Sequence, residues 1–433
     1  MPGPRLYNLF PLLAGPITGW VELLDRIIAM GFDWVFINPF HYPGFSGSLY
    51  AVKDYYRLHP LVQGDSRESP EELLSTFVRA AQRRGLRVAM DLVINHTSKD
   101  SLLAEQHPEF FEHEKDGSLR SPSAIDPADS RKVTVWGDLA EIDFSKRPER
   151  EALVAYWKKL VVHHAALGFR GFRCDAAYKV PAEVWTELIE EGRTCGDVIF
   201  FAETLGCRLA EAKGLAGAGF DYFFNSSKWW DFRAPWLLEQ YQSFRSTAPS
   251  IAFPESHDTP RLVAELRDKG VKDVGAIEAF YRQRYLFAAF FSSGLMMPMG
   301  FDRGYDRKLD VVTTRPEHAG PDLFDLGPFI AATHRAKTSI PALNVEGPQT
   351  LLTPPGSPVV GMLRETENSA NCCVALINPS TEWREIEIDS MPRVSRLPLS
   401  VACDTWPGAV QGDWRPGGRQ RLAPLAVSLL RSP

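Results

Sequence analysis

The feature that most constrains this chain is a regular alternation of short apolar runs with longer segments of helical periodicity, sustained over its first 340 residues. Short apolar runs are typical of buried parallel strands, and strands that alternate with helices are typical of repeated βα units. We expect strands at 6–10, 34–39, 87–93, 169–175, 198–203, 222–225, 250–253 and 295–299, and helices at 21–30, 70–84, 149–167, 182–193, 208–215, 235–244 and 276–291. Eight strands in this order predict an α/β fold that closes into a (β/α)8 TIM barrel.

Two stretches depart from this alternation. Residues 97–148 are polar, contain prolines and carry no strong helix or strand signal, so we interpret them as a B excursion from the barrel after its third strand. Beyond residue 345, short β-prone runs separated by proline and glycine predict a C-terminal antiparallel β-sandwich. The predicted domains are the barrel over 1–96 and 149–344, the excursion over 97–148, and the β domain over 345–433.

Composition excludes several classes of partner. The chain has 433 residues and a formal net charge of -6, which provides no basic surface for nucleic acid. No run approaches the roughly 18 continuous apolar residues of a membrane span, and the N-terminus lacks the pattern of a signal peptide. The six cysteines include no CxxC pair, so we expect free thiols. We therefore expect a cytoplasmic protein that binds a neutral or small molecule, without a nucleic-acid or membrane partner.

Acidic residues follow four of the predicted strands. Working residues of a TIM barrel lie at the C-terminal ends of its strands, where this chain has Asp91, Asp175, Glu203 and Asp258. Four acids on one rim repel one another, which raises the pKa of the least well paired one. Arg173 lies two residues before Asp175 on the same strand face and favours its charged form. Glu203 follows the more apolar run, so we expect it to hold the proton.

One ionised and one protonated carboxyl group are what cleavage of a glycosidic bond requires. We expect Asp175 to attack the anomeric carbon, while Glu203 protonates the leaving oxygen and later deprotonates the acceptor. Asp258 and His257 would hold the sugar hydroxyls. For a single acid at a strand end, a helix cap or a structural ion pair is an equally good explanation; four in order favour a catalytic rim.

The surrounding sequence resembles a known enzyme family. The segments DLVINH at 91–96, GFRCDAAYK at 171–179, FFAE at 200–203 and ESHD at 255–258 look like the four signature regions of the α-amylase superfamily, glycoside hydrolase family 13. LAEIDF at 139–144 resembles a further landmark that closes the family's B excursion. The resemblance covers about residues 5–340 and implies a retaining enzyme for α-glucosidic bonds. It implies a nucleophile, an acid/base and a transition-state stabiliser at Asp175, Glu203 and Asp258, with Tyr50, Asp91, His96, Arg173 and His257 as substrate contacts.

Other positions leave choices open. Lys179 could contact a +1 sugar or a phosphate, or be a surface lysine. Asn95 matches a calcium ligand of many amylases, but the rest of that ligand set is not identifiable, so the resemblance implies no required cofactor and leaves calcium open. The aromatic loops at 40–45 and 229–236 could be sugar platforms or core. Ala51 stands where family members that trim single glucoses have aspartate, which disfavours that activity.

Three functions are compatible with this sequence. The leading interpretation is an enzyme that hydrolyses or transglycosylates α-1,4-linked malto-oligosaccharides or α-glucans. An alternative is a maltosyltransferase that uses maltose 1-phosphate and an α-1,4-glucan acceptor; Lys179 and a cytoplasmic location favour it, and the lack of an additional N-terminal domain disfavours it. An alternative of another class is an inactive glucan-binding protein, which the presence of all three acids disfavours.

Overall fold

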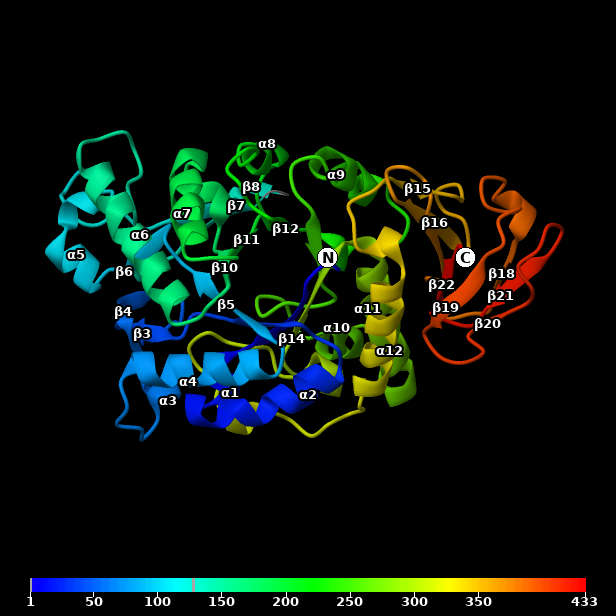
Figure 1. Ribbon diagram of the computed structural model, residues 1–433, viewed down its shortest axis with the longest axis horizontal. Helices are drawn as coiled ribbons and strands as arrows, with labels where there is room; N and C mark the ends of the chain where they lie inside the picture. The colour runs from blue at the N-terminus through cyan, green and yellow to red at the C-terminus, as the bar shows by residue number, and fades with distance from the viewer. Residues whose placement is uncertain (1, 127–128) are drawn as a thin grey trace.

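The computed structural model describes residues 2–126 and 129–433, and the expected TIM barrel is confirmed (Figure 1). Within the described residues, eight parallel strands close in the order β1-β14-β13-β12-β11-β10-β5-β2. They are β1 (Arg5–Leu9), β2 (Trp34–Ile37), β5 (Arg87–Leu92), β10 (Gly171–Cys174), β11 (Ile199–Ala202), β12 (Tyr222–Phe224), β13 (Ser250–Ala252) and β14 (Gly294–Pro298). All eight overlap the strands expected from the sequence.

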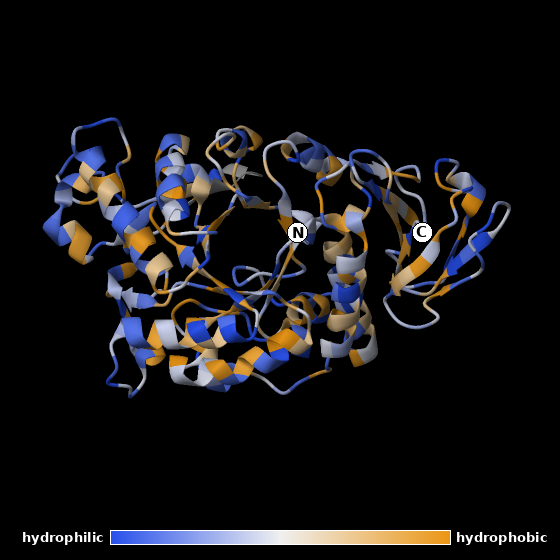
Figure 2. Cartoon of the chain, in the orientation of Figure 1, coloured by the Kyte–Doolittle hydropathy of each residue, from blue (hydrophilic) through white to orange (hydrophobic). Residues whose placement is uncertain are grey.

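Helices surround the barrel. They are α1 (Pro11–Ala14), α2 (Leu24–Ala29), α3 (Pro60–Gln63), α4 (Pro70–Arg83), α6 (Glu149–Ala166), α7 (Ala182–Thr194), α8 (Leu209–Lys213), α9 (Trp236–Phe244), α10 (Leu262–Asp268), α11 (Val274–Phe291) and α12 (Gly327–Ser339). Figure 2 shows hydrophilic and hydrophobic residues interspersed along these helices, as expected of amphipathic segments that bury one face. Among the described residues, no helix is both long enough and apolar enough to cross a membrane.

Helix α4 illustrates how the sequence sets an element's ends. Ser69 accepts a hydrogen bond from the backbone N–H of Glu72, and the Glu72 carboxylate accepts one from the backbone N–H of Ser69. This capping box satisfies N–H groups that have no partner inside the helix, and Pro70 fits the first helical turn. Gly85, at φ +80°, follows the C-terminus. The helix itself was expected at 70–84.

Several elements were not expected. Helices α10 and α12 lie where the sequence analysis placed none. The excursion contains β6 (His96–Ser98), α5 (Leu102–Gln106), β7 (Ser123–Asp126), β8 (Asp129–Val135) and β9 (Leu139–Glu141), none of which the sequence analysis assigned, because this stretch carries no strong helix or strand signal. The hairpin of β3 (His41–Pro43) and β4 (Val52–Leu58) also replaces a predicted loop. Short strands such as β6, whose partner β9 is remote in sequence, leave little periodic signal.

Two antiparallel sheets form the C-terminal part of the chain, as expected. One has the order β15-β16-β17-β22-β19 and the other β18-β21-β20. The strands are β15 (Gln349–Leu351), β16 (Val360–Glu365), β17 (Cys372–Ile377), β18 (Arg384–Glu387), β19 (Ser400–Asp404), β20 (Val410–Gln411), β21 (Arg419–Leu422) and β22 (Val427–Arg431). Helices α11 and α12 stand between the barrel strands and these sheets (Figure 1). The residue numbers proposed for the domain boundaries remain predictions.

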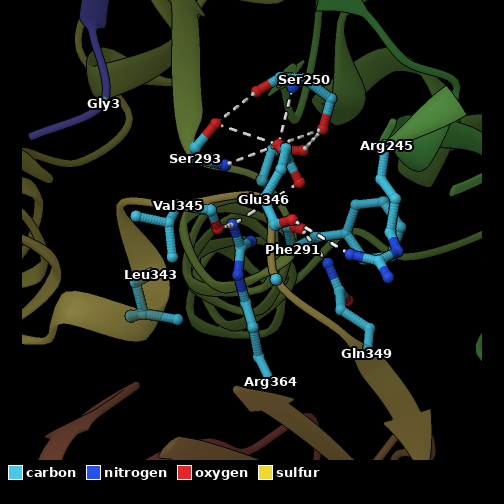
Figure 3. Close-up of polar contacts among 12 residues, drawn as sticks. Gly3, Arg245, Ser250, Phe291, Ser293, Leu343, Val345, Glu346, Gln349 and Arg364 are labelled. Carbon is cyan, nitrogen blue, oxygen red and sulfur yellow. Dashed lines mark hydrogen bonds and ion pairs between the residues drawn. The ribbon is translucent and has the colours of Figure 1, made fainter. Parts of the chain in front are cut away.

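A buried polar junction joins the barrel to the C-terminal sheets. The Glu346 carboxylate accepts hydrogen bonds from the backbone N–H of Ser250 at 2.6 Å and from the Ser293 hydroxyl at 2.9 Å, and Figure 3 shows both serines converging on it. Arg364, from β16, lies 3.7 Å from Glu346 and donates to three backbone carbonyls, including that of Phe290 at 2.8 Å. These contacts satisfy buried charges that would otherwise be costly. Ser250 and Ser293 lie at the N-terminal ends of β13 and β14, opposite the rim that carries the acids.

Candidate active site

Arg173 links two acids at the C-terminal rim of the barrel. It stands opposite Asp91 in the parallel pairing of β10 with β5, and its Nη1 lies 2.8 Å from Asp91 Oδ1. The same nitrogen lies 2.7 Å from Oδ1 of Asp175, the first residue after β10. The Arg173 and Asp91 side chains are buried, and 14% of the Asp175 side chain is exposed. One buried cation therefore orients a carboxylate that is partly exposed at the rim.

Tyr50 and His257 form the neighbouring wall. The Tyr50 hydroxyl donates to Asp91 Oδ2 at 2.7 Å and lies 2.7 Å from His257 Nε2. The two rings are nearly parallel, with an interplanar angle of 7° and centroids 5.7 Å apart. His257 Nε2 also lies 3.1 Å from Asp258 Oδ2. Because the Tyr50 proton is used on Asp91, we place a proton on His257 Nε2, where it faces two acceptors.

The surroundings of Glu203 favour its protonated form up to near neutral pH. It follows β11, the strand next to β10, and its two carboxyl oxygens accept backbone N–H bonds from Ala176 at 2.9 Å and Leu205 at 2.6 Å. Burial raises its pKa to about 7; the Arg173 charge opposes this rise and the Asp175 charge adds to it. Desolvation therefore outweighs the stabilising bonds. A general acid with a pKa near 7 is suited to both protonation and deprotonation.

Asp258 has the opposite tendency. Burial disfavours its charge, but His257, Arg173 and Lys308 outweigh this effect and lower its pKa to about 2. Its side chain is 62% exposed, so solvent screens these interactions. Burial raises the pKa of Asp91 to about 6, against the attraction of Arg173. The rim thus combines an ionised Asp258 with acids that hold their protons more tightly.

Asn95 and His96 contact the same centre. Asn95 donates from its amide to the Asp175 carboxylate at 3.2 Å and to the Asp175 carbonyl at 3.0 Å, and its own oxygen pairs with His96 Nδ1. His96 Nε2 lies 3.2 Å from the Tyr50 carbonyl. Both ends of Asn95 are thus engaged, and the described residues contain no group of three His, Cys, Asp or Glu side chains that could hold a metal. Calcium binding at Asn95 therefore stays a prediction, and we derive no step through that ion.

Comparison with known proteins finds relatives among enzymes that act on α-glucans. Residues 6–127 match the family model of the glucanotransferase domain of glycogen debranching enzyme. The chain is 29% identical over 433 residues to the alpha-1,4-glucan:maltose-1-phosphate maltosyltransferase of Burkholderia pseudomallei, covering 98% of this chain and 35% of that protein. The chain is similar to enzymes of the α-amylase family, glycoside hydrolase family 13. It spans about a third of the length of the maltosyltransferases that it matches.

Solved structures support the fold. An α-amylase from Geobacillus thermoleovorans, complexed with acarbose, superposes with a TM-score of 0.75 at 16% identity, over 99% of this chain and 98% of that one. A trehalulose synthase mutant superposes with a TM-score of 0.77 at 14% identity, over 99% of each chain. At these identities the likeness shows the fold alone. The roles of individual residues in this chain therefore rest on its own geometry.

Lys179 contacts the excursion. Its exposed Nζ donates to the Ser123 carbonyl of the excursion at 3.3 Å, so this contact orients it toward the excursion. The two aromatic loops divide between surface and core: Phe45 and Trp229 are 67% and 50% exposed, whereas Phe40 and Trp230 are buried. Phe45 and Trp229 are therefore the rings of these loops best able to stack on a sugar.

Sequence reasoning missed three features of this rim. Asn38, directly after β2, donates to the Tyr50 hydroxyl at 3.1 Å, and its position at a strand end could have revealed it. Lys308 acts on Asp258 from the loop after β14, which no motif marked. The third is a buried ion pair, Glu255 with Arg261, whose atoms lie 2.6 Å apart on either side of Asp258 in the sequence.

A cavity of about 330 Å³ lies beside this centre but is separate from it. Its walls include Thr204, Phe223, Trp236, Gln240 and Phe244. It lies along the outer surface of the barrel near α8 and α9, and its lining does not include the carboxylates of the rim. The catalytic hypothesis therefore rests on the rim and not on this cavity.

Proposed function

We propose that this chain is a retaining α-glucan-active enzyme that transfers maltosyl units from maltose 1-phosphate to an α-1,4-glucan. The observation that carries the retaining chemistry is the pairing of Asp175, held by Arg173 at 2.7 Å, with a buried Glu203 whose pKa is about 7. The names of the maltosyltransferases that it matches support the choice of donor and acceptor. This function was the alternative in the sequence analysis, and the comparisons support it better than the leading interpretation. A cytoplasmic location is part of the same proposal.

Each step uses residues of the rim. Asp175 attacks the anomeric carbon, the bond to the leaving oxygen breaks, and a covalent glycosyl ester forms on the Asp175 carboxylate. Glu203 donates its proton to the leaving oxygen, then accepts a proton from the acceptor hydroxyl as that oxygen attacks the same carbon. Asp258, ionised and paired with His257, holds sugar hydroxyls. Tyr50 offers its ring to the sugar face, while Asp91 and Arg173 hold the nucleophile in place.

Hydrolysis or transglycosylation of malto-oligosaccharides is the second candidate. The position of Lys179 favours it, because the lysine that could have contacted a phosphate donates to the Ser123 carbonyl of the excursion instead. A purely glucan-binding role is disfavoured, since the acids are present and each has a partner that a binding protein would not need.

The decisive experiment incubates the protein with maltose 1-phosphate and maltohexaose and follows both phosphate release and product length. Phosphate release together with products two glucose units longer supports maltosyl transfer. Redistribution of chain lengths without phosphate release supports transglycosylation, and shorter products alone support hydrolysis; either result overturns the proposed donor. Asp175→Ala is the control, and we expect it to bind maltohexaose without turnover. Binding by the wild type with no product of any kind would establish the glucan-binding alternative.

A further inference from the structure

The loop between β13 and α10 carries His257 and Asp258 and is stiffened from within. The backbone N–H of Asp258 donates to the Ser256 hydroxyl at 3.3 Å, and the Thr259 hydroxyl donates to the Ser256 carbonyl at 3.1 Å. These local bonds fix the shape of the turn. They do not fix where the turn stands relative to the rest of the rim.

A buried ion pair closes the base of this loop. Arg261 Nη1 donates to Glu255 Oε1 at 2.6 Å, and the other Glu255 oxygen accepts the backbone N–H of Leu262, the first residue of α10, at 2.7 Å. Both charged side chains are at most 1% exposed. The residues on either side of His257 and Asp258 in the sequence are therefore tied together.

The remaining donors of Arg261 reach a second loop. Nη2 donates to the Met299 carbonyl at 2.9 Å and Nε donates to the Arg307 carbonyl at 3.2 Å. These carbonyls lie at either end of the segment that follows β14 and leads to Lys308. Gly300, at φ +86°, lets the backbone pass this close, because a Cβ there would lie 3.2 Å from Arg261 Nη2 and closer still to Tyr305.

We propose that Arg261 is a positioning residue that holds the Asp258 loop and the Lys308 loop in register, so that Asp258 meets the reacting sugar at the required place. The planar guanidinium suits this task, because it presents donors to three acceptors in a fixed geometry that a lysine cannot reproduce. The proposal rests on the proposed function, since its consequence is read as catalysis. The role is indirect, through Asp258.

The test removes both charges together, because removing one would leave the other buried without a partner. The variant Glu255→Met with Arg261→Met is compared with the wild type on α-maltosyl fluoride, an activated donor that keeps slow rates measurable. We expect kcat/KM to fall about 100-fold, mainly through kcat, as for a displacement of about 1 Å in a catalytic group. The kcat/KM of Arg261→Lys, which keeps one contact, should lie between that of the wild type and that of the double methionine variant.

A double-mutant cycle separates positioning from general destabilisation. In an Asp258→Asn background, the two methionine substitutions should reduce the rate by less than about threefold, because the group they position is already disabled. A full loss in that background, or no loss in the wild type, overturns the proposal. Arg267→Met is the matched control, since Arg267 joins α10 to Asp306 of the same segment through an exposed pair at 2.7 Å and should have little effect.

Hydrogen exchange tests the same proposal without catalysis. In Arg261→Lys, amide exchange should accelerate at 253–262 and at 299–309 together, while the barrel helices stay protected. Exchange confined to one loop, or unchanged in both, contradicts the coupling. If the wild type does not turn over α-maltosyl fluoride, the proposed function fails, and the exchange measurement still decides whether Arg261 couples the loops.

Discussion

Replacing Glu203 by glutamine tests the protonation that the mechanism requires. Burial raises the pKa of Glu203 from 4.5 to about 7. An acid whose folded pKa is raised binds more protons in the folded state, so its charge destabilises the fold as pH rises from 4.5 through 7. At 1.36 kcal/mol for each pKa unit, the cost is about 3 kcal/mol above pH 7 and disappears below pH 4.5. Glutamine has no such titration.

The absolute stability of Glu203→Gln is not the informative quantity. Both Glu203 oxygens accept backbone N–H bonds, and glutamine offers one oxygen and one NH2 group in their place. One buried N–H then loses its acceptor, at a cost of about 1–3 kcal/mol that does not depend on pH. The change in unfolding free energy between two pH values isolates the titration, because the pH-independent cost cancels.

The assay is urea unfolding of the wild type and Glu203→Gln at pH 5 and pH 8.5. We expect the wild type to lose about 2.5 kcal/mol more than the variant over this range, because a small part of the cost is already present at pH 5. Glu190→Gln, at a solvent-exposed position on α7, is the matched control and should follow the wild type. Parallel pH dependence for wild type and Glu203→Gln would refute the argument that burial keeps this acid protonated, and with it the assignment of Glu203 as proton donor.

Three further substitutions probe the rim and its support. Tyr50→Phe keeps the ring but leaves Asp91 without the donor at 2.7 Å, so we expect about 1–3 kcal/mol of lost stability in urea unfolding and a lower kcat; unchanged values would refute the role of the hydroxyl. Trp229→Ala removes a ring that is 50% exposed and should raise KM for maltohexaose more than kcat changes; an unchanged KM would contradict a sugar platform. Burial lowers the pKa of His164 from 6.5 to about 3, so its contribution to stability is lost as pH falls below 6.5, by about 2 kcal/mol at pH 5. His164→Gln should remove that loss in urea unfolding at pH 5 and 7.5, and an equal loss in both proteins would contradict it.

The barrel could be predicted from the sequence because its strands are buried on both faces. Such strands appear as continuous apolar runs, as at Ile199–Ala202, and this signal does not depend on remote partners. The excursion could not be predicted in the same way. Its β8 is exposed along residues 131–135, so its side chains carry no alternation that separates a strand from a polar loop.

The candidate site also has a part that the sequence predicts and a part that it does not. Asp91, Asp175 and Glu203 lie at or directly after barrel strands, so strand ends alone brought them together. The contacts that orient them come from loops, such as Asn95 on Asp175 and Tyr50 on Asp91. Loop positions depend on hydrogen bonds between residues remote in sequence, and single-sequence patterns do not encode them. The direction of Lys179 is the clearest case, since only the fold reveals Ser123 as its partner.

The preference for a phosphorylated donor depends on which cation contacts the donor's phosphate. A phosphate on the donor sugar would enter a rim that already holds Asp175, Asp258 and Glu203, so it needs a positive partner. Lys308 acts on Asp258, whereas Lys179 donates to the excursion. We therefore expect Lys308→Met to raise KM for maltose 1-phosphate about tenfold, as for one charge-assisted contact, with a much smaller effect on maltohexaose. Lys179→Met, the matched control, should leave the ratio of the two KM values unchanged. If Lys179→Met alters that ratio and Lys308→Met does not, the phosphate lies on the excursion side of the cleft.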